Sequence, residues 1–125
     1  MMLRWLPPVL WIAVILGLSS IPGLGSSRPL FPGVDKLVHM GEYSVLGFLV
    51  ARALWLRGGP TWKVVVTAAI VGAVMGFVDE TYQASVPGRN SDPLDGVADF
   101  VGATIGGVFW LRWIRRSTTP VQRSP

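Results

Sequence analysis

Four long runs of mostly apolar residues constrain the fold of this chain more than any other feature. Each run is just long enough to cross the roughly 30 Å hydrocarbon core of a bilayer. The runs cover residues 5–21, 37–56, 62–82 and 94–114. They lack the polar face that a soluble helix needs, and only 14% of the chain is charged, against about 25% in a soluble domain. The sequence therefore predicts an all-α membrane protein, a bundle of four transmembrane helices.

The segments between these runs are rich in Gly, Pro and Ser, which break helices and suit loops. We predict one domain over residues 1–116 and a short, basic, disordered tail over residues 117–125. A second interpretation of the first run is a cleavable signal peptide, because Arg4 precedes it and small residues follow it. Ile21 and Pro22 make a poor cleavage context, and three membrane runs would remain in any case.

The distribution of basic residues predicts the orientation, because short cytoplasmic loops are enriched in Lys and Arg. One side of the predicted bundle carries eight of the eleven basic residues: Arg4, Arg52, Arg57, Lys63, Arg112, Arg115, Arg116 and Arg123. Both termini should therefore be cytoplasmic in a bacterial-type inner or plasma membrane. The net charge of +4 forms no stripe and accompanies no nucleic-acid-binding motif, so we expect no nucleic-acid partner. The lack of cysteine excludes thiolate sites and disulfides.

All the acidic residues and the only histidine lie in the outer loops or in the outer turns of the last three runs. They are Asp35, His39, Glu42, Asp79, Glu80, Asp92, Asp95 and Asp99. Because the chain reverses direction at each loop, the start of the second run, the end of the third and the start of the fourth meet at one membrane face. Charged groups at this depth are costly when exposed to lipid, so they should turn inward and form one polar site.

Helical spacing supports one shared site. Polar residues fall at i, i+4 and i+7 on the second run and at i, i+3 and i+7 on the fourth, so each set shares one face: Asp35, His39 and Glu42, and Asp92, Asp95 and Asp99. Gly102 and Gly106 are spaced as a small-residue pair that favours close helix approach. The bundle would then close around the site, with Lys36, Arg89 and protonated His39 as counter-charges.

Residues 35–107 contain an ordered combination that is rare in membrane helices: Asp35, Lys36, Leu37, Val38, His39, Glu42, Tyr43, Leu46, Gly47, Asp79, Glu80, Gln83, Pro87, Arg89, Asp95 and Gly102. This pattern resembles the VanZ-like family of small membrane proteins. The resemblance implies a four-helix membrane fold and, from the founding member, a link with low-level resistance to lipoglycopeptides such as teicoplanin. It implies no settled biochemical activity. Asp99 stands where the family pattern leads us to expect asparagine, and the added negative charge would change the proton or cation affinity of the site.

The candidate ligand-binding residues are Asp35, Lys36, His39, Glu42, Tyr43, Asp79, Glu80, Gln83, Arg89, Asp95 and Asp99. The preferred hypothesis is an extracytoplasmic pocket that binds an envelope lipid headgroup, a lipid-linked cell-wall component or a lipoglycopeptide. Lys36 and Arg89 would hold an anionic group, while the carboxylates and Gln83 would accept hydroxyls or amines. Packing is the main alternative for Tyr43. Membrane lipids are the expected partners, and a homo-oligomer is compatible with the sequence.

Two further hypotheses come from other classes of protein. An intramembrane hydrolase or transferase of envelope lipids would use His39, Glu42 or Asp79 as acid–base groups, although no nucleophile motif supports it. A divalent cation is compatible with His39, Asp79, Glu80 and Asp99 as ligands, whereas no motif indicates another cofactor. A proton-linked carrier is the third hypothesis, and the lack of polar residues in the cytoplasmic half argues against it.

Structural roles are the alternatives for three of these polar residues. His39 would be bonded to Glu42 or Asp79 as a purely structural histidine. Arg89 would pair with Asp92 instead of holding an anionic ligand. Asp92 itself is best explained as the N-cap of the fourth helix, because acids favour helix N-termini.

Overall fold

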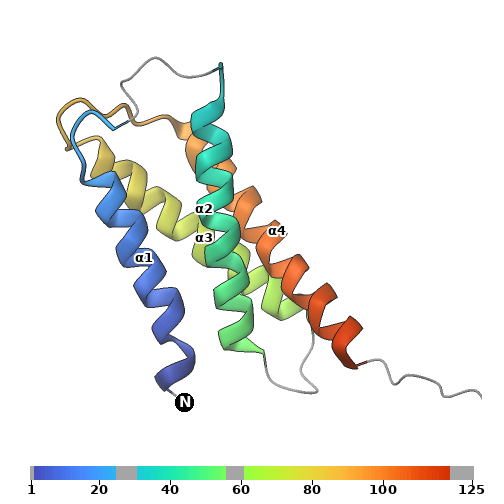
Figure 1. The fold of residues 1–125 in the computed structure, drawn as a ribbon. Helices are drawn as coiled ribbons and strands as arrows, with labels where there is room; N and C mark the ends of the chain where they lie inside the picture. The colour runs from blue at the N-terminus through green and yellow to red at the C-terminus, as the bar shows by residue number, and fades with distance from the viewer. Residues whose placement is uncertain (1, 25–30, 56–60, 119–125) are drawn as a thin grey trace, which may run out of the picture.

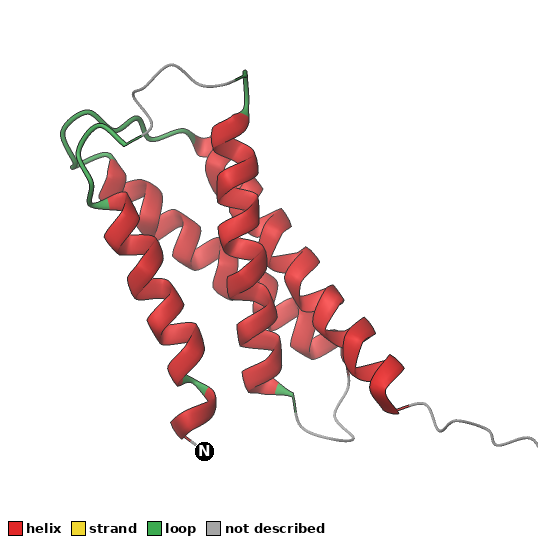
Figure 2. Ribbon diagram, in the orientation of Figure 1, coloured by secondary structure: helices red, strands yellow, loops and turns green. Residues whose placement is uncertain are grey.

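The computed structural model describes residues 2–24, 31–55 and 61–118, and this part of the chain is helical with no strand (Figure 2). A single 3-10 turn, η1 (Met2–Arg4), precedes α1 (Leu6–Ser19). The longer helices are α2 (Val34–Leu54), α3 (Thr61–Gln83) and α4 (Pro93–Thr118). The prediction of an all-α bundle of four helices is confirmed. Most of the predicted tail lies outside the described residues, and its first two residues, Ser117 and Thr118, belong to α4.

Three of the four helices, α2, α3 and α4, are long and apolar enough to cross a membrane. Their outward faces carry large apolar side chains such as Phe77, Ile70 and Phe109, as expected for a surface in contact with lipid. The first helix, α1, has 14 residues and is therefore about 21 Å long, shorter than an ordinary span. It still contributes to the core, because Ile15 is fully buried against Tyr43 and Leu46.

The loop before α4 is shaped by a tight turn. The Arg89 N–H donates to the Val86 carbonyl at 3.2 Å, with Pro87 and Gly88 as the two central residues. Gly88 has φ +75°, the left-handed value that a type II turn needs at its third position. Asp92 then caps α4, because its Oδ1 accepts the Leu94 N–H at 2.9 Å. The capping role predicted for Asp92 is confirmed.

Glycine brings the backbones of α2 and α4 into direct contact, and these two helices form the most extensive pair in the bundle. A Cβ added at Gly102 or Gly106 would overlap a backbone carbonyl of α2. From the other side, a Cβ at Gly47 would overlap the backbone of Ala103 on α4. The small-residue pair predicted for close helix approach is therefore confirmed.

The helices alternate in direction, as Figure 1 shows, so that the start of α2, the end of α3 and the start of α4 lie at one end of the molecule. The start of α1 and the end of α2 lie at the other end. Helix α2 begins at Val34, three residues before the predicted run, because Gly33 with φ +84° provides the N-cap. Asp35 and Lys36 consequently stand on the first turn of α2, at the same end as the N-terminus of α4.

Candidate functional site

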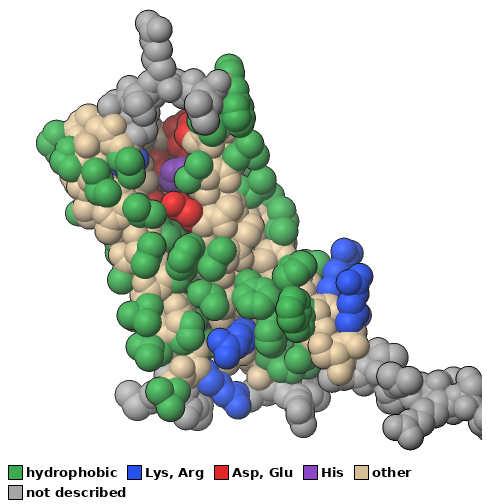
Figure 3. Space-filling view, viewed as in Figure 1, with side chains coloured by type: hydrophobic (Ala, Val, Ile, Leu, Met, Phe, Trp, Pro, Cys, Tyr) green, Lys and Arg blue, Asp and Glu red, His purple; other side chains and the backbone are tan. Residues whose placement is uncertain are grey.

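The acidic residues gather at one end of the bundle. Figure 3 shows acidic side chains and the histidine in a recess near that end, while most of the visible Lys and Arg surface lies at the opposite end. The acids come from the three long helices and from the residue just before α4. The convergence of these separate stretches of chain, which the sequence predicted, is thus a property of the fold.

Lys36 holds one group of three acids together. Its Nζ lies 2.7 Å from Asp92 Oδ2, 3.1 Å from Asp95 Oδ1 and 3.1 Å from Asp35 Oδ2. Asp95 is the buried member of this group. The hydrogen bond from Lys36 lowers the pKa of Asp92 below the usual aspartate range. The charge of Lys36 is therefore compensated by carboxylates of the protein itself, and its ion pairs link α2 to the start of α4.

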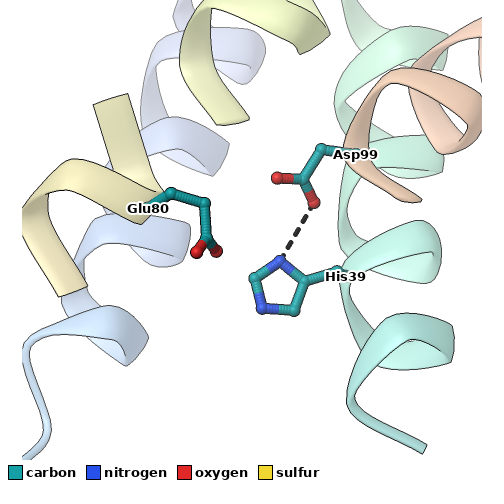
Figure 4. A group of neighbouring side chains, drawn as sticks. All are labelled: His39, Glu80 and Asp99. Atoms are coloured by element: carbon teal, nitrogen blue, oxygen red, sulfur yellow. Dashed lines mark hydrogen bonds and ion pairs between the residues drawn. The ribbon is translucent and has the colours of Figure 1, made fainter. Parts of the chain in front are cut away.

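His39, Glu80 and Asp99 form a second group, in which α2, α3 and α4 each supply one side chain (Figure 4). His39 Nδ1 lies 3.0 Å from Asp99 Oδ1. The Glu80 carboxylate points toward this pair, and one donor atom from each residue lies within 4.8 Å of the other two. The structural alternative with Glu42 or Asp79 as the partner of His39 is wrong, because the partner is Asp99.

The fold around this second group explains its geometry. A Cβ at Gly76 would lie 2.6 Å from Asp99 Oδ2, so the missing side chain on α3 makes room for the Asp99 carboxylate. The Glu80 carboxylate is held from the loop before α4, since its Oε2 accepts the Ser91 hydroxyl at 2.9 Å and the Asp92 N–H at 2.8 Å. These contacts fix one oxygen of Glu80 and leave the other free.

Asp79 and Gln83 connect α3 to α1 rather than joining the second group. Gln83 Nε2 donates to Asp79 Oδ2 at 2.9 Å and to Ser19 Oγ at 3.1 Å. Both Asp79 and Gln83 are buried. The predicted spacing of i and i+4 therefore places the two side chains in contact on α3, with α1 as the third partner.

Glu42 and Tyr43 lie one turn deeper along α2. The Glu42 backbone carbonyl accepts the Trp11 indole N–H at 2.8 Å, which joins α1 to α2, while its half-buried carboxylate has no hydrogen-bond partner among the described residues. Tyr43 packs in the core with Ile15, as the packing alternative expected, yet its buried hydroxyl has no partner either.

Four buried side-chain oxygens near this end have no hydrogen-bond partner among the described residues: Tyr43 OH, Asp79 Oδ1, Glu80 Oε1 and Asp99 Oδ2. Buried polar atoms in folded proteins are nearly always paired. Three of these four oxygens belong to carboxylates, which are strong acceptors of hydrogen bonds and good ligands for cations. The site is therefore rich in unused acceptors.

Arg89 is placed differently from either sequence hypothesis. Its guanidinium donates to the backbone carbonyls of Ser19 at 3.3 Å, Leu18 at 2.9 Å and Leu24. The last carbonyls of a helix lack partners within the helix, so Arg89 satisfies the end of α1. It forms no ion pair with Asp92, and its donors are used within the protein.

We expect Arg89→Gln to destabilise the protein by about 2 kcal/mol, because hydrogen bonds from a charged donor are each worth about 1.5–3 kcal/mol. The end of α1 should loosen locally. The chain contains no cysteine, so a single cysteine introduced as Ile21→Cys reports this loosening through its rate of maleimide labelling. Arg112→Gln, at an exposed position near the opposite end, is the matched control, and equal labelling rates in the two variants would contradict the role of Arg89.

A groove of about 660 Å³ lies between α3 and α4 beside the second acidic group. Its lining is mostly apolar and includes Phe77, Val97 and Phe100, whose side chains are exposed on the outer surface of the bundle. Glu80 and Ser91 also line it. An apolar groove on the lipid-facing surface therefore adjoins a buried carboxylate.

A family model for VanZ/LLP1 proteins matches residues 5–115, which include all four helices up to the last turn of α4. The chain belongs to the VanZ/LLP1 family. No curated protein and no solved structure matches it. Family membership and the three membrane-spanning helices make this VanZ-like chain a membrane protein, and they are consistent with a link to glycopeptide resistance. The resemblance drawn from residues 35–107 is confirmed.

Three residues near the site of this VanZ/LLP1 protein were not predicted from the sequence. Ser19 and Ser91 are hydrogen-bond partners of Gln83 and Glu80, and small polar residues beside loops carry no distinctive pattern. The position of Gly76 in the sequence does indicate its role. It stands one helical turn before Glu80, where a small residue allows another helix to approach a polar position.

Proposed function

We propose that the protein binds the polar head of an envelope amphiphile at the acidic end of its bundle, on the extracytoplasmic side of the bacterial cell membrane. The amphiphile would be a lipid, a lipid-linked cell-wall component or a lipoglycopeptide. One observation carries the proposal: the groove between α3 and α4 is lined by Glu80, whose buried Oε1 has no hydrogen-bond partner among the residues that the structure describes. A binding site for an amphiphile needs an apolar groove beside a polar group, and here the apolar groove adjoins the Glu80 carboxylate.

The protein's own contacts indicate which chemical groups the site would recognise. Lys36 and Arg89, the cations that the sequence suggested for an anionic group, already bond to carboxylates and backbone carbonyls. The unused groups are acceptors, so the site favours a head that donates hydrogen bonds through hydroxyls or amines. The apolar part of the amphiphile would lie in the groove against Phe77 and Phe100.

Charge distribution supports the extracytoplasmic placement of the site. Arg4, Arg52, Lys63 and Arg112 lie near the helix ends opposite the acidic group. Basic residues concentrate on the cytoplasmic side of membrane proteins. This supports cytoplasmic termini and an outward-facing acidic end.

Blocking the groove tests the proposal. Gly96 lines the groove, and a Cβ added there meets no atom within 4 Å, so Gly96→Leu should fill the groove without disturbing the helices. We expect this variant to bind teicoplanin about 10-fold more weakly in detergent, a loss of about 1.4 kcal/mol, and to lose any protection against teicoplanin in a susceptible host.

Gly41→Leu is the matched control, because Gly41 lies on α2 outside the groove and a Cβ there also meets nothing within 4 Å. Membrane expression of both variants should equal that of the wild type. If Gly96→Leu retains both binding and protection, the groove is not the binding site.

A second candidate function, hydrolysis or group transfer on an envelope lipid, is favoured by the contact between His39 Nδ1 and Asp99 Oδ1. A carboxylate that orients an imidazole in this way is a common arrangement for a general base. Turnover of a radiolabelled envelope-lipid extract by purified protein, abolished by His39→Gln, would favour this candidate over simple binding.

A further inference from the structure

We infer that His39, Glu80 and Asp99 form a binding site for a divalent first-row transition-metal cation such as Zn²⁺. This inference goes beyond the proposed function, because metal binding requires no amphiphile. The two acidic groups lie near each other at the same end of the bundle, and among the described residues only the first contains a lysine.

The group of Asp35, Asp92 and Asp95 contains its own cation. Lys36 Nζ lies within 3.1 Å of an oxygen from each of these three carboxylates. A metal ion placed among them would have to displace the ammonium. This group is therefore structurally complete as the protein stands.

Among the described residues, the group of His39, Glu80 and Asp99 contains no lysine or arginine. Within the described part of the chain, no Lys or Arg side chain pairs with Glu80 or Asp99. Asp99 has no exposed surface and Glu80 is only 8% exposed, so water compensates little of their charge. Two carboxylates held in a membrane-embedded bundle with one imidazole leave a negative charge that a divalent cation would neutralise.

The geometry of the ligand atoms suits a metal. Metal bonds from imidazole and carboxylate are about 2.0–2.2 Å long, which places neighbouring ligand atoms of a tetrahedral site about 3.3–3.6 Å apart. His39 Nδ1 and Asp99 Oδ1 are separated by 3.0 Å, and an atom of Glu80 lies within 4.8 Å of both. The Glu80 side chain points toward the pair in Figure 4. A modest rotation of this side chain would bring its carboxylate into bonding distance of a metal ion held by His39 and Asp99.

Two atoms point independently to a ligand at this site. Asp99 Oδ2 and Glu80 Oε1 are buried and accept no hydrogen bond from any described residue. The other oxygen of Glu80 is held by Ser91 and the Asp92 N–H, an outer shell of the kind that orients metal ligands. One imidazole with two carboxylates suits Zn²⁺ or Mn²⁺ better than Mg²⁺ or Ca²⁺, which favour oxygen ligands alone. Three protein ligands would leave a coordination position open.

The test uses the full chain purified in detergent, stripped with chelator and titrated with Zn²⁺ by calorimetry. We expect about one Zn²⁺ per chain with micromolar or tighter affinity, and a rise in Tm on binding. Asp99→Asn preserves the shape of the side chain, so it should fold. It should weaken Zn²⁺ binding by about 100-fold or more, as should His39→Gln.

Asp35→Asn is the matched control, because it alters the neighbouring acidic group and should leave the Zn²⁺ affinity unchanged. Co²⁺ gives a second measurement on the wild-type protein, since visible absorption bands should appear on binding and disappear when Zn²⁺ is added. Gly96→Leu should bind Zn²⁺ as the wild type does, whether or not it weakens amphiphile binding. The metal site and the proposed function are therefore tested separately.

Three results would overturn the metal site. The first is that the wild-type protein takes up neither Zn²⁺ nor Co²⁺ at millimolar concentration. The second is that Asp99→Asn binds as tightly as the wild type. The third is that Asp35→Asn loses binding as completely as Asp99→Asn, which would assign the ion to the other acidic group. If Asp99→Asn does not fold, Glu80→Gln is used in the same comparison.

Discussion

Gly47→Ala should destabilise the bundle by about 3 kcal/mol, although alanine is the better helix former. The added Cβ would overlap the backbone of Ala103 on α4. Backbone cannot rotate away as a side chain can, so α2 and α4 would have to separate. The loss of helical circular dichroism with increasing SDS in mixed micelles measures the change in stability.

Gly41→Ala is the control for this experiment. Gly41 lies on the same helix, and a Cβ at this position meets no atom within 4 Å. The variant should be at least as stable as the wild type. Equal stability of the Gly41 and Gly47 variants would show that the two backbones do not approach as closely as the structure describes.

Lys36→Met should also destabilise the bundle, because Lys36 is the cation that pairs with the buried Asp95, and its removal leaves that carboxylate uncompensated. Asp95 is only 4% exposed and would lose its cation. The double substitution of Lys36→Met with Asp95→Asn removes that buried charge as well, and should recover most of the stability. The same SDS titration measures both variants.

Lys63→Met is the control for Lys36, since Lys63 is an exposed lysine near the opposite end, 5.7 Å from the Trp62 ring centroid. The pH dependence provides a second check. Because Lys36 lowers the pKa of Asp92, this carboxylate stabilises the fold at neutral pH, and the contribution disappears as the pH falls through the lowered pKa. Lys36→Met should reduce this acid-induced loss, and an unchanged acid profile would contradict the contact.

The sequence predicted the number of helices and the meeting of the acids, because both depend on features that repeat along the chain. Apolar length indicates a membrane helix, and reversal at each loop places alternate helix ends together. The spacing of Asp92, Asp95 and Asp99 likewise predicts one shared face. These inferences need no knowledge of which side chain touches which.

Individual partners were less predictable. Arg89 bonds to backbone carbonyls of α1, and every residue has such a carbonyl, so no residue type marks the partner. Asp35 and Glu42 lie within one turn of His39 on α2, and other acids face it from α3 and α4. The choice of Asp99 as its partner depends on Gly76, which gives that carboxylate room to approach. The extra charge at Asp99, singled out from the sequence, nevertheless lies in the most buried part of the site.

The short loop between α3 and α4 mechanically couples the first helix to the polar site. Arg89 in this loop donates hydrogen bonds to the end of α1. Ser91 and Asp92, slightly further along the loop, donate hydrogen bonds to the carboxylate of Glu80. A force that tilts α1 in the bilayer would pull on the loop and redirect Glu80. Lateral pressure or a neighbouring protein acting on α1 would thus shift a buried carboxylate that neither one touches.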